Sequence, residues 1–450
     1  MGDTRSAYSE VVVRIVPARR AHSHRLQETD ESGTGGGGRR YNVLVYTELP
    51  LPDISTNTEP PAGQPRTLAG LPFAGRERIG VIWDHYEEFL AAFVEGNKTL
   101  EHMRERLLEA VPPVLEALFG APPQSARPVR VWWSCESPEL DDLPWELAAY
   151  SARAADPQNF YFVRGLPPSQ PAPAIPFTPP LRLALLHQPQ HTHPSLLDAF
   201  SALPPSIQLV PLDGPPHKVL EEVAREGYEL LHIVSDGVVS LGHEGILLFH
   251  GAGESGRQVS PGELSSLLRG SRVGLVCLST QDYGNPDYMN ITGRRVPSAY
   301  RAFTYLGGSR LPLPTVVTPL GPLKQGEARN FWGSFYENLA QSLSPQRAFN
   351  HAQAACGTLP VALFLRHTQD VLFRDRPQAA SPDAPDPTDL GAALSFSHEL
   401  IAQLRTHRET YGEVSEGLSQ FIASEEERQQ ELSEALDKWF ETEEGQSNES

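Results

Sequence analysis

The chain has 450 residues, which suggests two or three domains of ordinary size. Its 39% hydrophobic and 21% charged residues indicate a globular protein with a buried core, and its 42 prolines exclude a coiled coil along the whole length. The formal net charge of −19 argues against nucleic-acid binding, because phosphates would be repelled.

The three cysteines, Cys135, Cys277 and Cys356, are too scattered for a disulfide framework or a thiolate zinc site. The amino terminus lacks the apolar core of a signal peptide. No run reaches the roughly 18 apolar residues that a membrane span needs. We therefore expect a cytoplasmic protein that does not bind membranes.

Acidic side chains gather near the end of the chain. Residues 391–450 carry 14 acidic and four basic side chains, a net charge of −10, so the first 390 residues hold only −9 of the total of −19. A proline-rich stretch before this region is typical of an extended linker. We predict an N-terminal half at 1–175, an α/β domain at 176–376, the linker at 377–388 and an acidic helical extension at 389–450.

The N-terminal half is expected to contain strands and helices. Two β-branched runs at 10–16 and 41–47 can pair, and the glycine-rich segment between them is interpreted as a hairpin tip because no phosphate-loop lysine follows it. Residues 50–75 are rich in proline and are expected to be irregular. Helical spacing predicts two helices between 84 and 118, and a strand is predicted at 128–133.

Short apolar runs alternate with helical segments from residue 181 onward. Apolar runs without alternation are typical of strands buried on both faces of a parallel sheet. The predicted strands are 181–186, 207–210, 229–234, 246–249, 273–278 and 315–317, and the predicted helices are 195–202, 217–226, 261–268, 296–306 and 327–342. We therefore expect an α/β fold, with its chemistry beyond the carboxyl ends of the strands.

Six motifs follow one another along the chain: LPWE at 143–146, LRLALL at 181–186, LLHIVSDG at 230–237, LVCLSTQ at 275–281, VPSA at 296–299 with PTVV at 314–317, and FWGSFYENLA at 331–340. In this order they resemble the CHAT domain, a family of caspase-like cysteine peptidases often found with tetratricopeptide repeats. Their succession is more specific than any single motif. The resemblance implies a caspase-like, mostly parallel sheet with helices on both faces, preceded by a β-containing half and followed by a helical extension.

In this family a histidine before a glycine follows one strand, and a cysteine follows the next long strand. The resemblance places Asp236, before Gly237, at the histidine position and Gln281 at the cysteine position. An amide is not a nucleophile, and a carboxylate beside it has nothing to deprotonate. No catalytic residue is therefore expected. The resemblance implies an inactive pseudopeptidase that acts as a scaffold, adaptor or regulator by binding proteins.

By the same resemblance, the setting is a bacterial defence or conflict system, with an active caspase-like peptidase or a tetratricopeptide-repeat protein as partner. Apolar residues at three- and four-residue steps through 389–442 predict helices whose apolar stripe needs a cover, either from the α/β body or from a partner. Acidic helices favour a basic partner surface and a salt-sensitive association. No cofactor is expected.

A relocated catalytic pair is an alternative to the inactive site. His232 and Cys277 both lie inside predicted strands, where a core imidazole and a buried, inert thiol are the simpler interpretation, and His243 lies in the following loop. Ser279 or Thr280, activated by the neighbouring amide, gives a serine or threonine version. A third interpretation is a sensor whose vacated pocket binds a small ligand through the residues at 236 and 281.

Three histidines, His187, His191 and His193, follow the predicted strand at 181–186. Imidazole is a ligand that zinc accepts. Pro189 and the lack of a well-placed carboxylate favour a short polar loop, so no metal is expected there.

Overall fold

A computed structural model gives the fold of the chain. It describes residues 8–17, 39–49, 59–81, 100–110, 127–136, 143–151, 159–167, 174–187, 194–239, 245–251, 254–259, 264, 267–268, 271–280, 315–320, 323, 325–365, 367, 370–375, 394, 429–430 and 433–434. The chain divides into two compact units, Met1–Asp375 and Arg376–Ser450. The predicted linker at 377–388 lies outside the described residues.

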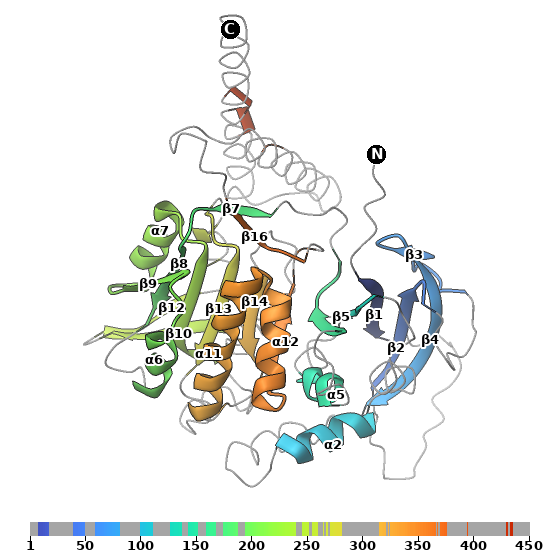
Figure 1. Ribbon diagram of the computed structural model, residues 1–450. Helices are drawn as coiled ribbons and strands as arrows, with labels where there is room; N and C mark the ends of the chain where they lie inside the picture. The colour runs from blue at the N-terminus through green and yellow to red at the C-terminus, as the bar shows by residue number, and fades with distance from the viewer. Residues whose placement is uncertain are drawn as a thin grey trace, which may run out of the picture. The chain divides into compact units, whose positions relative to one another are not determined.

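One sheet of fourteen strands runs through the first unit (Figure 1). Its strands are β1 (Ser9–Pro17), β2 (Arg39–Thr47), β3 (Thr67–Leu68), β4 (Leu71–Val81), β5 (Val129–Cys135), β6 (Phe160–Arg164), β8 (Leu181–Leu186), β9 (Ile207–Leu212), β10 (Leu230–Val239), β11 (Gly245–Gly251), β12 (Glu254–Val259), β13 (Leu275–Thr280), β14 (Thr315–Pro319) and β15 (Val361–Phe364). A separate two-stranded sheet pairs β7 (Ile175–Phe177) with β16 (Phe373–Asp375).

The helices with defined bounds belong to the same unit as this sheet. They are α2 (Leu100–Ala110), α5 (Trp145–Ser151), α6 (Pro194–Ser201), α7 (Pro216–Glu226), α11 (Gln325–Ser342) and α12 (Pro345–Cys356). None of the described helices is long and apolar enough to cross a membrane.

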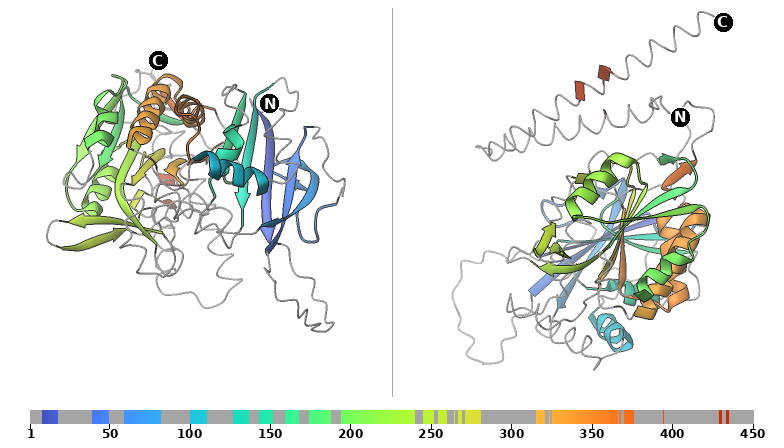
Figure 2. Two further views of the ribbon diagram at one scale, coloured as in Figure 1. Left: turned by 90° about the horizontal axis from the view of Figure 1, so that it is seen from below. Right: turned by 90° about the vertical axis from the view of Figure 1, so that its left-hand side faces the viewer.

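The second half of the sheet confirms the predicted α/β fold. Its order is β9, β8, β10, β13, β14, β15, in which all neighbours are parallel except β14 and β15. Strand β9 pairs only with β8 among the described strands. Alternate residues of β10 enter two separate cores: Leu231 and Ile233 pack with side chains of α7, whereas Leu230 and Val234 join the core that includes α6, α11 and α12. Helices therefore cover both faces (Figure 2).

The first half continues the same sheet in the order β6, β5, β1, β2, β4, β3. The predicted pairing of 10–16 with 41–47 is confirmed, since β1 and β2 are antiparallel with Val13 opposite Val45. The expectation that 50–75 is irregular is wrong from residue 67, because Ala69 and Gly70, both with positive φ, form the tight turn between β3 and β4.

Strand β10 is longer than the predicted 229–234. It pairs in parallel with β13 as far as Ser235 and in antiparallel with β11 from Asp236 to Val239. Asp236 and Gly237 therefore lie inside a strand, and the expectation of a loop at this position is wrong. The reason is that a second neighbour, β11, supplies backbone hydrogen-bond partners after the parallel ladder ends.

Candidate functional site

The candidate site lies where β10 leaves the parallel sheet. Ser235 is the last residue of β10 paired with β13, and its partner there is Thr280. Asp236 follows as the first residue paired with β11, opposite Leu248. Gln281 and His243 lie outside the described residues. The position expected to hold the family's histidine is thus at the carboxyl end of the parallel ladder, where ligands bind in open α/β sheets.

His232 lies four residues before Asp236 in β10 and is completely buried. Its Nδ1 is 2.7 Å from the hydroxyl of Tyr336 on α11, and its Nε2 is 2.8 Å from Oγ of Ser279 on β13. Burial lowers the pKa of the imidazole to about 3. The ring is therefore neutral at pH 7 and has a hydrogen-bond partner at each nitrogen, as expected for a core histidine.

Two aromatic rings close the space around His232. Phe200 of α6 and Trp332 of α11 meet the imidazole edge to face, with ring centroids 4.8 and 4.7 Å from it. Both side chains are themselves buried. The imidazole consequently has apolar walls and hydroxyl groups at its two nitrogens, an environment that disfavours its charged form.

Cys277 is the register partner of His232 on β13. Its side chain is buried, and burial raises the pKa of the thiol to about 12, although a hydrogen bond with Tyr336 opposes this shift. Because the thiolate is the nucleophilic form, this cysteine is unreactive in the folded protein. The two residues of the alternative dyad are close neighbours, but neither has the protonation state or the exposure that thiolate chemistry requires.

Together these residues make one buried chain of hydrogen bonds, from Cys277 through Tyr336 and His232 to Ser279. The chain of hydrogen bonds ties α11 to β10 and β13. The sequence predicts Ser279 as a residue activated by the amide at 281 and does not point to Tyr336. The available signal was the spacing of Trp332 and Tyr336, which places both on one face of α11.

The Leu-Pro-Trp-Glu corner is held by a buried ion pair. Glu146 of α5 accepts hydrogen bonds of 2.7 and 2.8 Å from Nε and Nη2 of Arg164, and Nη2 also donates to the carbonyl of Leu143. Trp145 is buried against Trp133, with ring centroids 4.9 Å apart. The corner is therefore part of the core of the first half.

The histidine cluster is only partly described. His187 directly follows β8 and is half-buried, and burial lowers its pKa while the nearby carboxylate of Asp213 opposes the shift. His191 and His193 lie outside the described residues. Within the part of the chain that the structure describes, no three His, Cys, Asp or Glu side chains are grouped to hold a metal ion.

Comparison with known proteins identifies the second half of the sheet. The family model of the CHAT domain matches residues 182–377. This part of the chain is CHAT-like. The matched region, hereafter the CHAT region, runs from the second residue of β8 to two residues beyond β16 and includes positions 236 and 281. The resemblance stated from the motifs is thus confirmed for this region, while the residues before it lie outside the match.

Two solved structures resemble the fold. The complex of Porphyromonas gingivalis RgpB pro- and mature domains has a TM-score of 0.35 and 10% identity, and the match covers 64% of this chain and 78% of that one. The Arg specific cysteine proteinase gingipain R (RGPB) has a TM-score of 0.32 and 8% identity, with 59% and 65% covered. No curated protein matches the chain.

Proposed function

We propose that this protein is a CHAT-like pseudopeptidase that acts as a scaffold, adaptor or regulator by binding another protein. The observation that carries the proposal is the residue identity at two positions, Asp236 and Gln281. A carboxylate and an amide in these places provide a base without a nucleophile, and covalent attack on a peptide carbonyl has no agent.

The surroundings of this position support the proposal. The two strands concerned, β10 and β13, carry the imidazole of His232 and the thiol of Cys277, and burial keeps both in their neutral, shielded forms. A substitute dyad would need an exposed thiolate beside a histidine that can take up a proton. The local chemistry therefore favours retention of the fold for binding.

Activity is tested with the purified full chain and a peptide library. We expect no turnover above that of the buffer, and no modification of Cys277 in native protein by an electrophilic thiol probe, whereas denatured protein is modified. The denatured sample is the control that shows the probe is competent. Peptide turnover that disappears in Cys277→Ala or Ser279→Ala would overturn the proposal.

Binding is tested by comparing the full chain with a chain that ends at residue 388. The acidic extension carries a net charge of −10 over residues 391–450, so we expect it to retain a partner with a basic surface. The candidate partners are an active caspase-like peptidase and a tetratricopeptide-repeat protein, in a bacterial defence setting. We expect retention at 0.1 M salt and its loss at 0.5 M salt or after truncation. Failure of the full chain to retain either class of protein would contradict this role.

A second candidate function rests on a specific contact. Ser279 Oγ lies 2.8 Å from Nε2 of His232, whose other nitrogen is oriented by Tyr336, and this is the order of nucleophile, base and orienting group found in serine hydrolases. In such a reaction the serine proton would pass to the imidazole as Oγ attacks an acyl carbon, and the imidazolium would protonate the leaving group. All three side chains are buried and therefore shielded from a substrate. For this reason the hydrolase is the second candidate function.

A fluorophosphonate probe separates the two functions. A hydrolase predicts labelling of Ser279 in native protein that is lost in Ser279→Ala and His232→Gln. A pseudopeptidase predicts no labelling of Ser279. Ser201, an exposed serine of α6, is the internal comparison for background reaction with the probe.

A further inference from the structure

One face of helix α12 carries three buried amide side chains. Gln346, Asn350 and Gln353 are spaced by four and three residues, so they form a single stripe along the helix. At most 2% of any of these residues is exposed. A buried amide needs hydrogen-bond partners for both its N–H donors and its carbonyl oxygen. The residues that supply these partners therefore identify the surface that this face of the helix contacts.

The first amide reaches across to the N-terminal half. Gln346 Oε1 accepts a hydrogen bond of 3.0 Å from Nη1 of Arg130, and its Nε2 donates to the hydroxyl of Tyr8 and, at 3.1 Å, to Oδ1 of Asp370. Arg130 is fully buried and is neutralised by Glu10, which accepts from Nε at 3.0 Å and also from Nη2. An apolar side chain on α12 would leave this guanidinium short of a partner.

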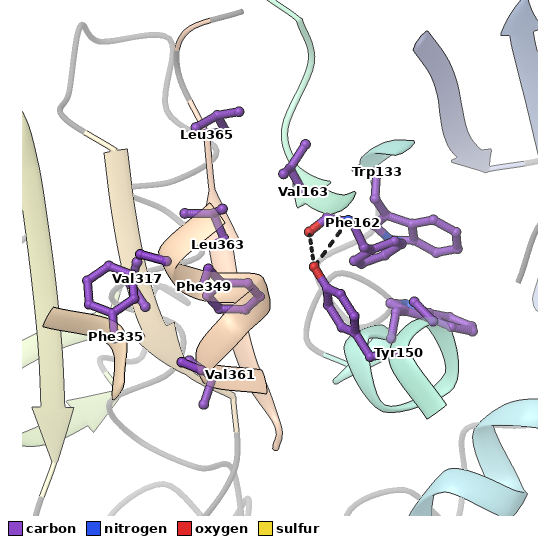
Figure 3. Packing of buried hydrophobic residues seen from close by; sticks show 14 of the residues in the cluster. Trp133, Tyr150, Phe162, Val163, Val317, Phe335, Phe349, Val361, Leu363 and Leu365 are labelled. Carbon is purple, nitrogen blue, oxygen red and sulfur yellow. Dashed lines mark hydrogen bonds between the residues drawn. The ribbon is translucent and has the colours of Figure 1, made fainter. Parts of the chain in front are cut away.

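The second amide also crosses to the N-terminal half. Asn350 Nδ2 donates to the carbonyl of Phe160 at 2.5 Å, and its Oδ1 lies 2.7 Å from the hydroxyl of Tyr150. That hydroxyl in turn accepts a hydrogen bond of 3.2 Å from the backbone N–H of Phe162 (Figure 3). Asn350 thus contacts both α5 and the start of β6.

The third amide does not cross. Gln353 Nε2 donates to the carbonyls of Leu359 and Val361 at 3.0 and 3.2 Å, and its Oε1 accepts from the N–H of Leu359 at 2.6 Å. These partners belong to the same half as α12. Gln353 is therefore an internal control, with the same residue class, burial and helix but no partner in the other half.

Backbone pairing between the halves is short by comparison. Strands β15 and β6 share a single register pair, Phe364 with Arg164, and the N–H of Leu365 donates to the Arg164 carbonyl at 3.2 Å. The chain connecting the halves runs from the end of β6 to the start of β7. Apolar side chains of both halves share one core, and the polar part of the recognition is supplied by side chains of α12. This helix lies on the side of the CHAT region nearer β5 and α5 (Figure 1).

We propose that residues 8–165 are a built-in partner that docks non-covalently on α12 and the edge of β15, so that the two halves remain a complex after the chain between them is cut. The surface is specific because each crossing amide needs a matched set: a guanidinium and a phenol for Gln346, and a carbonyl and a phenol for Asn350. This inference is independent of whether the CHAT region is active.

The first experiment uses the full chain with a protease site inserted between Pro167 and Ile175. After complete cleavage the two fragments are expected to elute together in size-exclusion chromatography at both 0.1 M and 1 M NaCl. Salt should have little effect because the crossing contacts are buried, where charges are weakly screened. Separation of the fragments at low salt in the absence of denaturant would overturn the proposal.

The second experiment compares variants of the same cleavable chain. In Q346L/N350L we expect the cut halves to dissociate about 10- to 100-fold faster, since polar groups of the N-terminal half lose buried partners. Gln353→Leu should lower the melting temperature of the uncut protein while the dissociation rate of the cut halves stays within about threefold of the parent. Equal acceleration in both variants would contradict a specific docking surface.

If Q346L/N350L does not fold, Tyr150→Phe tests the same contact from the other side. It removes one hydroxyl and keeps the aromatic ring that packs 6.0 Å from Phe349. We expect about 5- to 20-fold faster dissociation of the cut halves. An unchanged rate in this variant would count against the proposal.

Discussion

Glu146 and Arg164 form an ion pair in which neither side chain is exposed to solvent. The pair joins the first turn of α5 to the end of β6, and the same guanidinium holds the carbonyl of Leu143 at the start of the corner. The Leu-Pro-Trp-Glu motif therefore has a definite structural role, because its glutamate neutralises a buried charge inside the first half.

Removing one partner of this pair should be more harmful than removing both. Glu146→Ala leaves a buried guanidinium without a counter-charge, and we expect it to lower the free energy of unfolding by about 3–5 kcal/mol. Glu146→Leu combined with Arg164→Met should cost less than either single change, because no buried charge remains. Urea unfolding of the single and double variants measures the difference. A double variant as unstable as the sum of the singles would refute the coupling.

His232 should make the stability of the protein depend on pH. Its pKa is about 3 in the folded protein and near the ordinary 6.5 when unfolded, so the unfolded chain takes up the proton first. The stabilisation is complete above pH 6.5 and is lost as the pH falls from 6.5 toward 3, by at most about 1.4 kcal/mol per pH unit.

Urea unfolding at pH 7, 6 and 5 tests this dependence. The slope should be smaller in His232→Gln, which retains hydrogen-bonding capacity but does not titrate. The groups that face the ring, Tyr336, Cys277 and Ser279, do not change charge in this range, because burial raises the pKa of both titratable ones and the serine is neutral. Equal slopes in the two proteins would show that other groups govern the acid response.

The hydroxyl of Tyr336 should stabilise the folded protein more than the hydroxyl of Tyr46 does. Tyr336→Phe leaves His232 Nδ1 and the Cys277 thiol without this partner, and we expect a loss of about 1–3 kcal/mol. Tyr46 is equally buried, but its hydroxyl makes only a long contact of 3.4 Å with the carbonyl of Pro65. Tyr46→Phe should therefore cost less than about 1 kcal/mol. Thermal unfolding of the two variants, measured in parallel, gives both losses of stability. A larger loss in Tyr46→Phe than in Tyr336→Phe would contradict the importance of the buried chain of hydrogen bonds.

Two glycines should respond to alanine in opposite ways. A Cβ at Gly274 would lie 2.1 Å from Cδ1 of Ile175 and 3.2 Å from Cε1 of Phe373, so the side chain of Ile175 must move and about 1–3 kcal/mol should be lost. A Cβ at Gly333, inside α11, meets no atom within 4 Å. Gly333→Ala should therefore stabilise the protein by up to about 1 kcal/mol. Differential scanning calorimetry of both variants checks the two signs.

Six predicted apolar runs of the CHAT region coincide with strands, namely β8, β9, β10, β11, β13 and β14, whereas β12, β15 and β16 were not predicted. Runs such as those of β8 and β14 were predictable because they are buried on both faces. The run at 181–186 coincides with β8, and the predicted helix at 327–342 is α11 with two further residues at its start. Strand β10 was predicted too short, since Asp236 and Gly237 interrupt the apolar pattern and their strand conformation depends on β11. Local residue types do not encode that neighbour.

Helix α12 was missed although its end signals are present. Ser344 caps its start by accepting from the N–H of Arg347, Pro345 occupies the first turn, and Gly357 ends it in the left-handed conformation. Its buried amides resemble a polar, exposed face in sequence, and this hides a core helix. The contact of His232 with Ser279 was also beyond sequence reasoning, because it depends on the register between β10 and β13, two strands joined by a long connection.

The placement of Pro211 in β9 has a consequence for behaviour at high concentration. Proline lacks an amide hydrogen, so a foreign strand that approached the outer side of β9 would meet a gap in its row of donors. At the opposite limit of the CHAT sheet, β6 already occupies the flank of β15. Neither the outer side of β9 nor the flank of β15 offers an uninterrupted template for polymerisation, and we expect concentrated solutions to resist fibre growth from these two strands.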